Sequence, residues 1–168
     1  MTSLHARTPD PVADQSHILV MEDEQTVARG LEMVLEEEGY HVDLAYTGNQ
    51  ALKNLAEKRF ELLIADLRLP DLDGMEVVRT VKKRQPETEV VVITGYSSVS
   101  SAVDAMKLGV FDYLTKPFTD SEIKTAVGEA LRKLRQAPPA RIQDRVSGEE
   151  YKLVQKRELL RVLNRTAE

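Results

Sequence analysis

The sequence contains no cysteine among its 168 residues, which excludes disulfides, thiolate metal sites and cysteine nucleophiles. Long apolar runs are also missing. None approaches the roughly 18 residues that a membrane span needs, and residues 1–16 lack the apolar stretch of a secretory signal. We therefore expect a cytoplasmic protein without a membrane partner.

Basic residues are in the minority, because 23 Lys and Arg stand against 28 Asp and Glu and leave a net charge of −5. This balance argues against direct nucleic-acid binding. The length suits one domain with a real core and a short tail. A hydrophobic fraction of 42% and a charged fraction of 30% are those of an ordinary globular chain.

Apolar, strand-like segments alternate with segments of helical period five times along the chain. The apolar segments near residues 62–65 and 90–93 show no polar alternation, as expected for parallel strands that are covered on both faces. The pattern predicts an α/β fold with a doubly wound, five-stranded parallel sheet. The predicted strands are Ile18–Met21, His41–Tyr46, Glu61–Ala65, Glu89–Thr94 and Phe111–Thr115.

Four positions mark where the predicted helices begin and end. Thr47 and Thr119 each precede a Gln or Glu by three residues, which is the spacing of a capping box. Gly39 and Gly109 fall where helices would end in a left-handed residue.

The two ends of the chain carry different patterns from the middle. Residues 1–16 are predicted to be a disordered segment, and residues 17–136 a single domain. Pro138-Pro139 ends the last helix of that domain and gives a Pro-containing linker over 137–146. Residues 147–168 are predicted to form an amphipathic helical tail, because leucines 153, 160 and 163 make an apolar stripe with a basic border.

Polar residues stand where four of the predicted strands end. Glu22-Asp23, Asp66 and Lys116 follow the first, third and fifth strands, and Thr94 ends the fourth. The carboxyl ends of parallel strands share one edge of a sheet, where such folds build their sites. Carboxylates, a hydroxyl and an ammonium at one edge suit phosphoryl chemistry with Mg²⁺, a hard cation that prefers oxygen ligands.

Together with the segment Leu69-Pro70-Asp71-Leu72-Asp73-Gly74, these residues resemble the receiver domain of bacterial two-component response regulators from about His17 to Arg135. The resemblance implies a flavodoxin-like strand order of 2-1-3-4-5. It implies that Asp66 is the phosphoacceptor and that Mg²⁺ is the cofactor. Asp23 would bind the metal directly, Glu22 mainly through water, and the backbone carbonyl of Arg68 would be a further ligand.

The same resemblance implies roles for the surrounding residues. Lys116 would pair with the acyl phosphate, and its bond to Pro117 would be cis. Thr94 would move toward the phosphate, and Tyr113 would turn inward behind it as part of the switch. Arg68 and Tyr96 occupy positions that tune the lifetime of the phosphoryl group.

The implied partners are a sensor histidine kinase or phosphotransfer protein and an unknown downstream protein, with a second copy of the chain as a further candidate. The protein would not be an enzyme beyond its own phosphoryl transfer and dephosphorylation. The segment 91–118 resembles receivers of ATPase-containing transcriptional regulators, so a fragment of such a regulator is an alternative.

Two other functions are disfavoured by the sequence. Residues 71–74 superficially match a haloacid-dehalogenase phosphohydrolase motif, but they do not directly follow a predicted strand. A degenerate receiver that serves only as a scaffold is disfavoured because every expected site residue is present.

Overall fold

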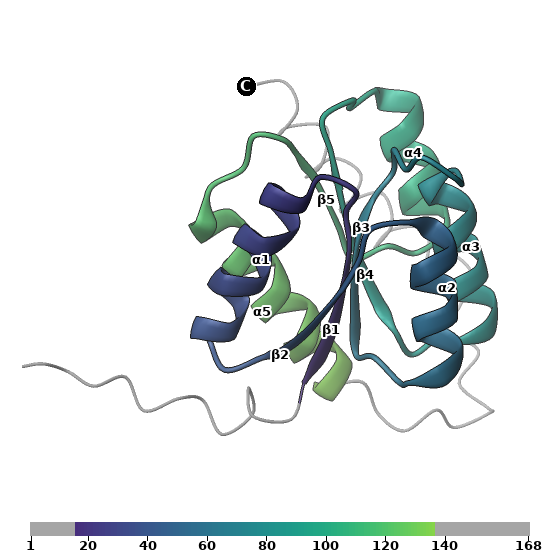
Figure 1. Ribbon diagram of the computed structural model, residues 1–168. Helices are drawn as coiled ribbons and strands as arrows, with labels where there is room; N and C mark the ends of the chain where they lie inside the picture. The colour runs from purple at the N-terminus through teal and green to yellow at the C-terminus, as the bar shows by residue number, and fades with distance from the viewer. Residues whose placement is uncertain (1–15, 137–168) are drawn as a thin grey trace, which may run out of the picture.

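The computed structural model describes residues 16–136, and its centre is one sheet of five parallel strands (Figure 1). The strands lie in the order β2-β1-β3-β4-β5, which confirms the predicted topology. Apart from Ser16, the predicted N-terminal segment lies outside the described residues, as do the linker 137–146 and the tail 147–168. The strands are β1 His17–Met21, β2 His41–Ala45, β3 Leu62–Asp66, β4 Glu89–Thr94 and β5 Asp112–Thr115.

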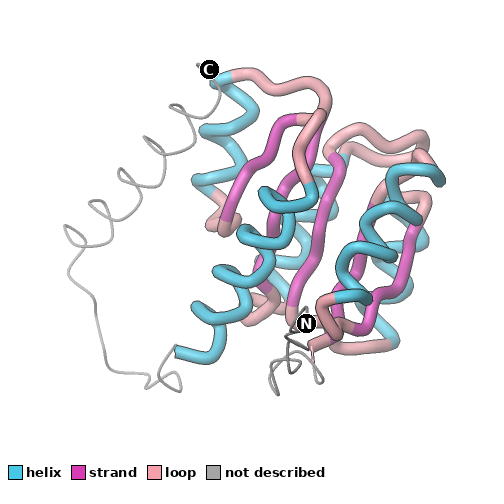
Figure 2. The backbone as a smooth tube through the Cα atoms, turned by 90° about the vertical axis from the view of Figure 1, so that its left-hand side faces the viewer, coloured by secondary structure: helices cyan, strands magenta, loops and turns pink. Residues whose placement is uncertain are grey.

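Helices cover both faces of this sheet (Figure 1). On one face lie α1 and α5, and on the other lie α2, α3 and α4 (Figures 1 and 2). The helices are α1 Gln25–Glu37, α2 Gly48–Glu57, α3 Gly74–Arg84, α4 Val99–Lys107 and α5 Asp120–Gln136. No helix within residues 16–136 is long and apolar enough to cross a membrane.

The sheet separates two hydrophobic cores, and successive residues of each strand contribute to them in turn. In β1, Leu19 and Met21 pack toward α2, α3 and α4. Ile18 and Val20 pack toward α1 and α5. Because both faces are buried, the central strands are apolar at every interior position. Each fully buried large aliphatic side chain contributes about 2 kcal/mol.

The helix boundaries follow the predicted signals. Thr47 Oγ1 accepts a hydrogen bond from Gln50 N at 3.1 Å, and Thr119 Oγ1 accepts one from Glu122 N at the same distance. Gly39 and Gly109 have φ angles of 94° and 82°, the left-handed region that favours glycine.

Five strand boundaries differ from the prediction by one residue. β1 begins one residue earlier, at His17, and β3 ends one residue later, at Asp66. Tyr46 lies beyond β2, because its N–H bonds to the Gln50 side chain at 2.8 Å. Glu61 and Phe111 precede β3 and β5, although their N–H groups still bond to the neighbouring strands. Differences of this size are usual at the ends of elements.

Candidate functional site

The carboxyl ends of β1 and β3 bring three carboxylates together. Glu22 follows β1 and is fully buried, Asp66 ends β3 and is 4% exposed, and Asp23 is exposed. One carboxylate oxygen from each lies within 4.8 Å of the others, and no other group of three potential ligands was found in residues 16–136. The convergence predicted from the strand ends is present.

Lys116 joins this cluster from the loop after β5. Its Nζ lies 2.6 Å from Glu22 Oε2 and 2.8 Å from Asp66 Oδ2, so one ammonium contacts two carboxylates. The backbone N–H of Lys116 donates to the carbonyl of Thr94 at 2.8 Å, which ties the loop to the end of β4. The Lys116-Pro117 bond is cis, as the resemblance implied.

Burial controls the electrostatics of these groups. The pKa of Glu22 is raised to about 7, mainly by burial; the bond from Lys116 acts to lower it, and the adjacent Asp66 acts to raise it. Burial acts to lower the pKa of Lys116, but its bonds to Asp66 and Glu22 outweigh this and raise the pKa above its usual value. The ammonium is therefore held in its charged form beside the carboxylates.

Thr94 and Tyr113 lie in β4 and β5, the two strands that follow β3 in the sheet. Thr94 is 1% exposed at the end of β4, and its Oγ1 accepts a bond from Tyr96 N at 3.2 Å. Tyr113 in β5 is also 1% exposed, and its hydroxyl donates to Ser101 Oγ in α4 at 3.2 Å. The sequence did not identify Ser101, because a serine in the first turn of a helix has no distinguishing signal.

Arg68 and Tyr96 contact one another across the edge of the site. The Arg68 guanidinium carbon lies 3.3 Å from the centroid of the Tyr96 ring, a cation–π contact between the loops after β3 and β4. The backbone N–H of Arg68 donates to Asp66 Oδ1 at 3.0 Å. Both side chains line a hollow of about 330 Å³ that also includes Thr94 and Ser101. The sequence singled out both residues but not their contact.

The donor set fits a hard divalent cation. Glu22, Asp23 and Asp66 offer only carboxylate oxygens, which are the ligands that Mg²⁺ prefers, and the exposure of Asp23 leaves room for water. Lys116 offsets part of the negative charge but leaves an excess. The roles of these residues as ligands, and that of the Arg68 carbonyl, remain predictions.

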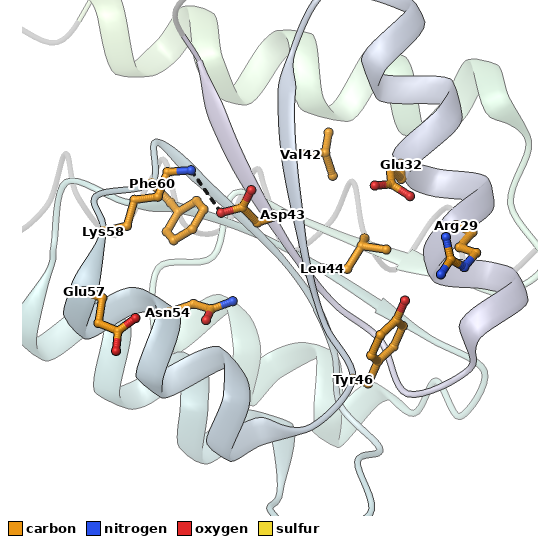
Figure 3. A pocket seen from close by; sticks show the side chains of 10 residues that line it. All are labelled: Arg29, Glu32, Val42, Asp43, Leu44, Tyr46, Asn54, Glu57, Lys58 and Phe60. Carbon is orange, nitrogen blue, oxygen red and sulfur yellow. Dashed lines mark hydrogen bonds and ion pairs between the residues drawn. The ribbon is translucent and has the colours of Figure 1, made fainter.

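A separate hollow of about 480 Å³ lies beside the edge strand β2, between α1 and α2 (Figure 3). Charged and polar side chains, among them Arg29, Glu32 and Glu57, surround it, and Lys58 bonds to Asp43 at 3.0 Å (Figure 3). None of the predicted site residues lines this hollow. We therefore place the chemistry at the carboxyl end of the sheet.

Comparison with known proteins agrees with this geometry. Residues 18–128 match the family described as the response regulator receiver domain. An uncharacterized transcriptional regulatory protein, YkoG of Bacillus subtilis, is 38% identical over 119 residues, covering 71% of this chain and 52% of that protein. The transcriptional regulatory protein ZraR of Klebsiella oxytoca is 38% identical over 122 residues, covering 73% of this chain and 28% of that protein.

Solved receiver structures share the fold. A CheY-like receiver domain protein from Methanospirillum hungatei has a TM-score of 0.70 and 28% identity, covering 71% of this chain and 96% of that one. The beryllofluoride-activated NtrC4 receiver domain dimer has a TM-score of 0.68 and 36% identity, covering 70% and 98%. The chain thus spans nearly all of these receivers but only about half or less of the two curated relatives.

Proposed function

This chain belongs to the family of response regulator receiver domains of two-component systems, and on that premise we propose that Asp66 accepts a phosphoryl group from a histidine kinase or phosphotransfer protein. The observation that carries the proposal is the contact of Lys116 Nζ with both Asp66 and Glu22, at 2.8 and 2.6 Å. A carboxylate needs such a neighbouring positive charge to receive an anionic group.

The transfer forms a bond between an Asp66 carboxylate oxygen and phosphorus, and it breaks the bond between phosphorus and the donor's histidine nitrogen. Lys116 stabilises the phosphoryl oxygens, and the Thr94 hydroxyl donates to one of them. Asp23 and Asp66 would hold Mg²⁺ directly and Glu22 mainly through water, with the Arg68 carbonyl as a further ligand. When bound, the metal supplies positive charge that offsets the carboxylates and the incoming phosphate.

Thr94 and Tyr113 transmit the change in charge to a protein surface. Both side chains are buried, and the hydroxyl of Tyr113 contacts α4 through Ser101. A bond from Thr94 to the phosphoryl group would compete with its present bond to Tyr96 N. Phosphorylation thereby shifts the populations of conformers at α4, β5 and α5.

The lifetime of the phosphoryl group is tuned by Arg68 and Tyr96. Their side chains are in contact, and the backbone N–H of Arg68 is bonded to Asp66 Oδ1 at 3.0 Å. This pair limits the approach of water to the acyl phosphate. In this reading the domain catalyses only its own phosphoryl transfer and dephosphorylation.

The output is contact with a downstream protein or with a second copy of the chain. Similar proteins are named transcriptional regulators, and one similar receiver was solved as a dimer. Because the chain spans only part of those regulators, a receiver of a larger transcriptional regulator is the alternative that these names favour.

The test uses acetyl phosphate as a small phosphodonor. Intact-mass analysis should show one phosphoryl adduct on the full chain with Mg²⁺, and none in EDTA or in Asp66→Asn. Asp43→Asn makes the same change of charge at an exposed ion pair away from the site, and it should be labelled like the unaltered protein. Labelling of Asp66→Asn, or labelling without metal, would overturn the assignment.

A further inference from the structure

The loop between β3 and α3 is bonded to the beginning of α2 by the Asp71 side chain. Asp71 Oδ1 accepts from Gly48 N at 2.8 Å, and Oδ2 accepts from Asn49 N at 2.8 Å. These are the first two residues of α2, and they are more than twenty residues from Asp71 in the sequence. One carboxylate thus joins two elements through two short hydrogen bonds.

The chemistry of a helix N-terminus explains why a carboxylate is used. The first N–H groups of a helix have no partner within it, and that end carries partial positive charge. Thr47 Oγ1 accepts from Gln50 N, so Thr47 and Asp71 together satisfy the N–H groups of residues 48 to 50. The bond from Asn49 N holds the pKa of Asp71 below its usual value.

Close packing beside the carboxylate strengthens the same connection. A Cβ on Gly48 would lie 2.9 Å from Leu72 Cβ, so the absence of a side chain at Gly48 allows the loop to approach α2. Leu72 also packs against the hydrophobic core beneath α2 and α3. Asp71 and Leu72 therefore dock the middle of the loop on α2.

The two ends of the same loop contact the phosphoacceptor. The N–H of Arg68 donates to Asp66 Oδ1 at 3.0 Å, and the N–H of Gly74 donates to the Leu67 carbonyl at 2.9 Å. A Cβ on Gly74 would lie 2.3 Å from the Asp66 carbonyl, which leaves no space for a side chain there. A shift of the loop at residue 71 would therefore change the positions of Asp66 and Arg68.

We propose that Asp71 is a positioning residue, whose bonds to the N-terminus of α2 hold the β3–α3 loop in the conformation that aims the backbone of Arg68 at the metal site. This inference rests on the proposed function, because it concerns the loop that would supply the Arg68 carbonyl to Mg²⁺. Linkage makes the effect reciprocal: Mg²⁺ that binds the ordered loop also stabilises the contact with α2.

The experiment compares Asp71→Asn with the unaltered full chain. Asparagine keeps the shape, but it presents an NH₂ group to one of the two backbone donors and removes the charge. Mg²⁺ affinity, measured by calorimetry, should fall about tenfold, the size of effect that residues supporting a metal ligand have. In EDTA, hydrogen exchange at the amides of Gly48, Asn49 and Arg68 should become faster. In the unaltered chain, Mg²⁺ should slow exchange at Gly48 and Asn49.

Three further variants isolate the loop contact. Gly48→Ala displaces Leu72 and should weaken Mg²⁺ binding in the same direction as Asp71→Asn. Thr47→Ala removes the α2 cap without touching the loop, and Asp43→Asn makes the same change of charge elsewhere. These last two should bind Mg²⁺ like the unaltered protein.

Each outcome decides a separate point. Unchanged Mg²⁺ affinity and unchanged exchange at Arg68 in Asp71→Asn would overturn the positioning role. An equal loss of affinity in Thr47→Ala would also overturn it, because the cause would then be the stability of α2. If the unaltered chain binds no Mg²⁺, the proposed function fails, and exchange at Arg68 in EDTA alone decides whether Asp71 positions the loop.

Discussion

Glu22 is the residue on which the electrostatics of the metal-free site depend. Its side chain is fully buried between Asp66, which repels its charge, and Lys116, which attracts it. Burying a carboxylate costs several kcal/mol unless it is paired or protonated. The pKa of about 7 is therefore the result of desolvation that the single ammonium offsets only in part.

This shift predicts how stability depends on pH when no metal is bound. Between about 4.5 and 7 the native state holds a proton on Glu22 that the unfolded chain has released. The free energy of unfolding should therefore fall as pH rises through this window. Urea unfolding in EDTA at pH 5 and pH 8 measures the difference, and Glu22→Gln should make it smaller.

Glu36→Gln provides the control for that experiment, because Glu36 is exposed on α1. It should leave the pH dependence unchanged. A stability that rises from pH 5 to pH 8 by the same amount in all three proteins would contradict the role assigned to Glu22.

Residues whose position follows from strand ends were predictable from the sequence, whereas residues whose contacts depend on loop conformation were not. Asp66, Thr94 and Lys116 converge because parallel strands place their carboxyl ends at one edge. Asp71 reaches α2 through a loop with no periodic pattern, so its partners could not be inferred. Ser101 could likewise not be singled out, because its role depends on a contact with the hydroxyl of Tyr113, which lies in another element.

At the scale of elements, the boundaries of α4 illustrate what local signals can establish. Gly109 predicts where this helix ends, and the structure has α4 at Val99–Lys107 with Ser98 as its N-cap. Ser98 Oγ accepts from Ser101 N at 3.0 Å, a local bond that fixes where the helix begins. Such bonds lie within one turn, which is why capping patterns can be read without tertiary structure.

Two glycines in helical regions should respond to alanine in opposite directions. Gly30 lies inside α1, and a Cβ there would meet nothing within 4 Å, so Gly30→Ala should stabilise the domain by about 0.5 to 1 kcal/mol. Gly109 follows α4 with a φ of 82°, so Gly109→Ala should destabilise the domain by about 1 kcal/mol through backbone strain. Urea unfolding of the two variants beside the unaltered chain measures both effects.

The two variants act as controls for one another, because each adds the same methyl group without a steric contact. Destabilisation by Gly30→Ala would mean that the face of α1 around residue 30 is packed against another segment of the full chain. Tolerance of Gly109→Ala would mean that the turn after α4 can adopt another conformation.

At the scale of the whole molecule, the site and the cores are arranged so that a local change can reach one side of the sheet. Asp66 lies in the central strand β3, and Thr94 and Tyr113 lie in the successive neighbours β4 and β5. β5 is one of the two edge strands, with α4 on one face and α5 on the other (Figure 1). The remaining edge strand, β2, contributes none of the site residues.

Beryllofluoride, a mimic of the phosphoryl group, should therefore change the amide chemical shifts of the full chain in α4, β5 and α5 as well as in the loops of the site. The physical reason is that a ligand shifts conformers only when it interacts differently with them, and Thr94 is the buried hydroxyl that can do so here. Ser101→Ala, which removes the acceptor of the Tyr113 hydroxyl, should alter the response in α4 and leave binding of the mimic intact. Changes confined to residues 22–24 and 66–74 would contradict a switch through β4 and β5. An identical response in Ser101→Ala would show that the bond between Tyr113 and Ser101 takes no part in it.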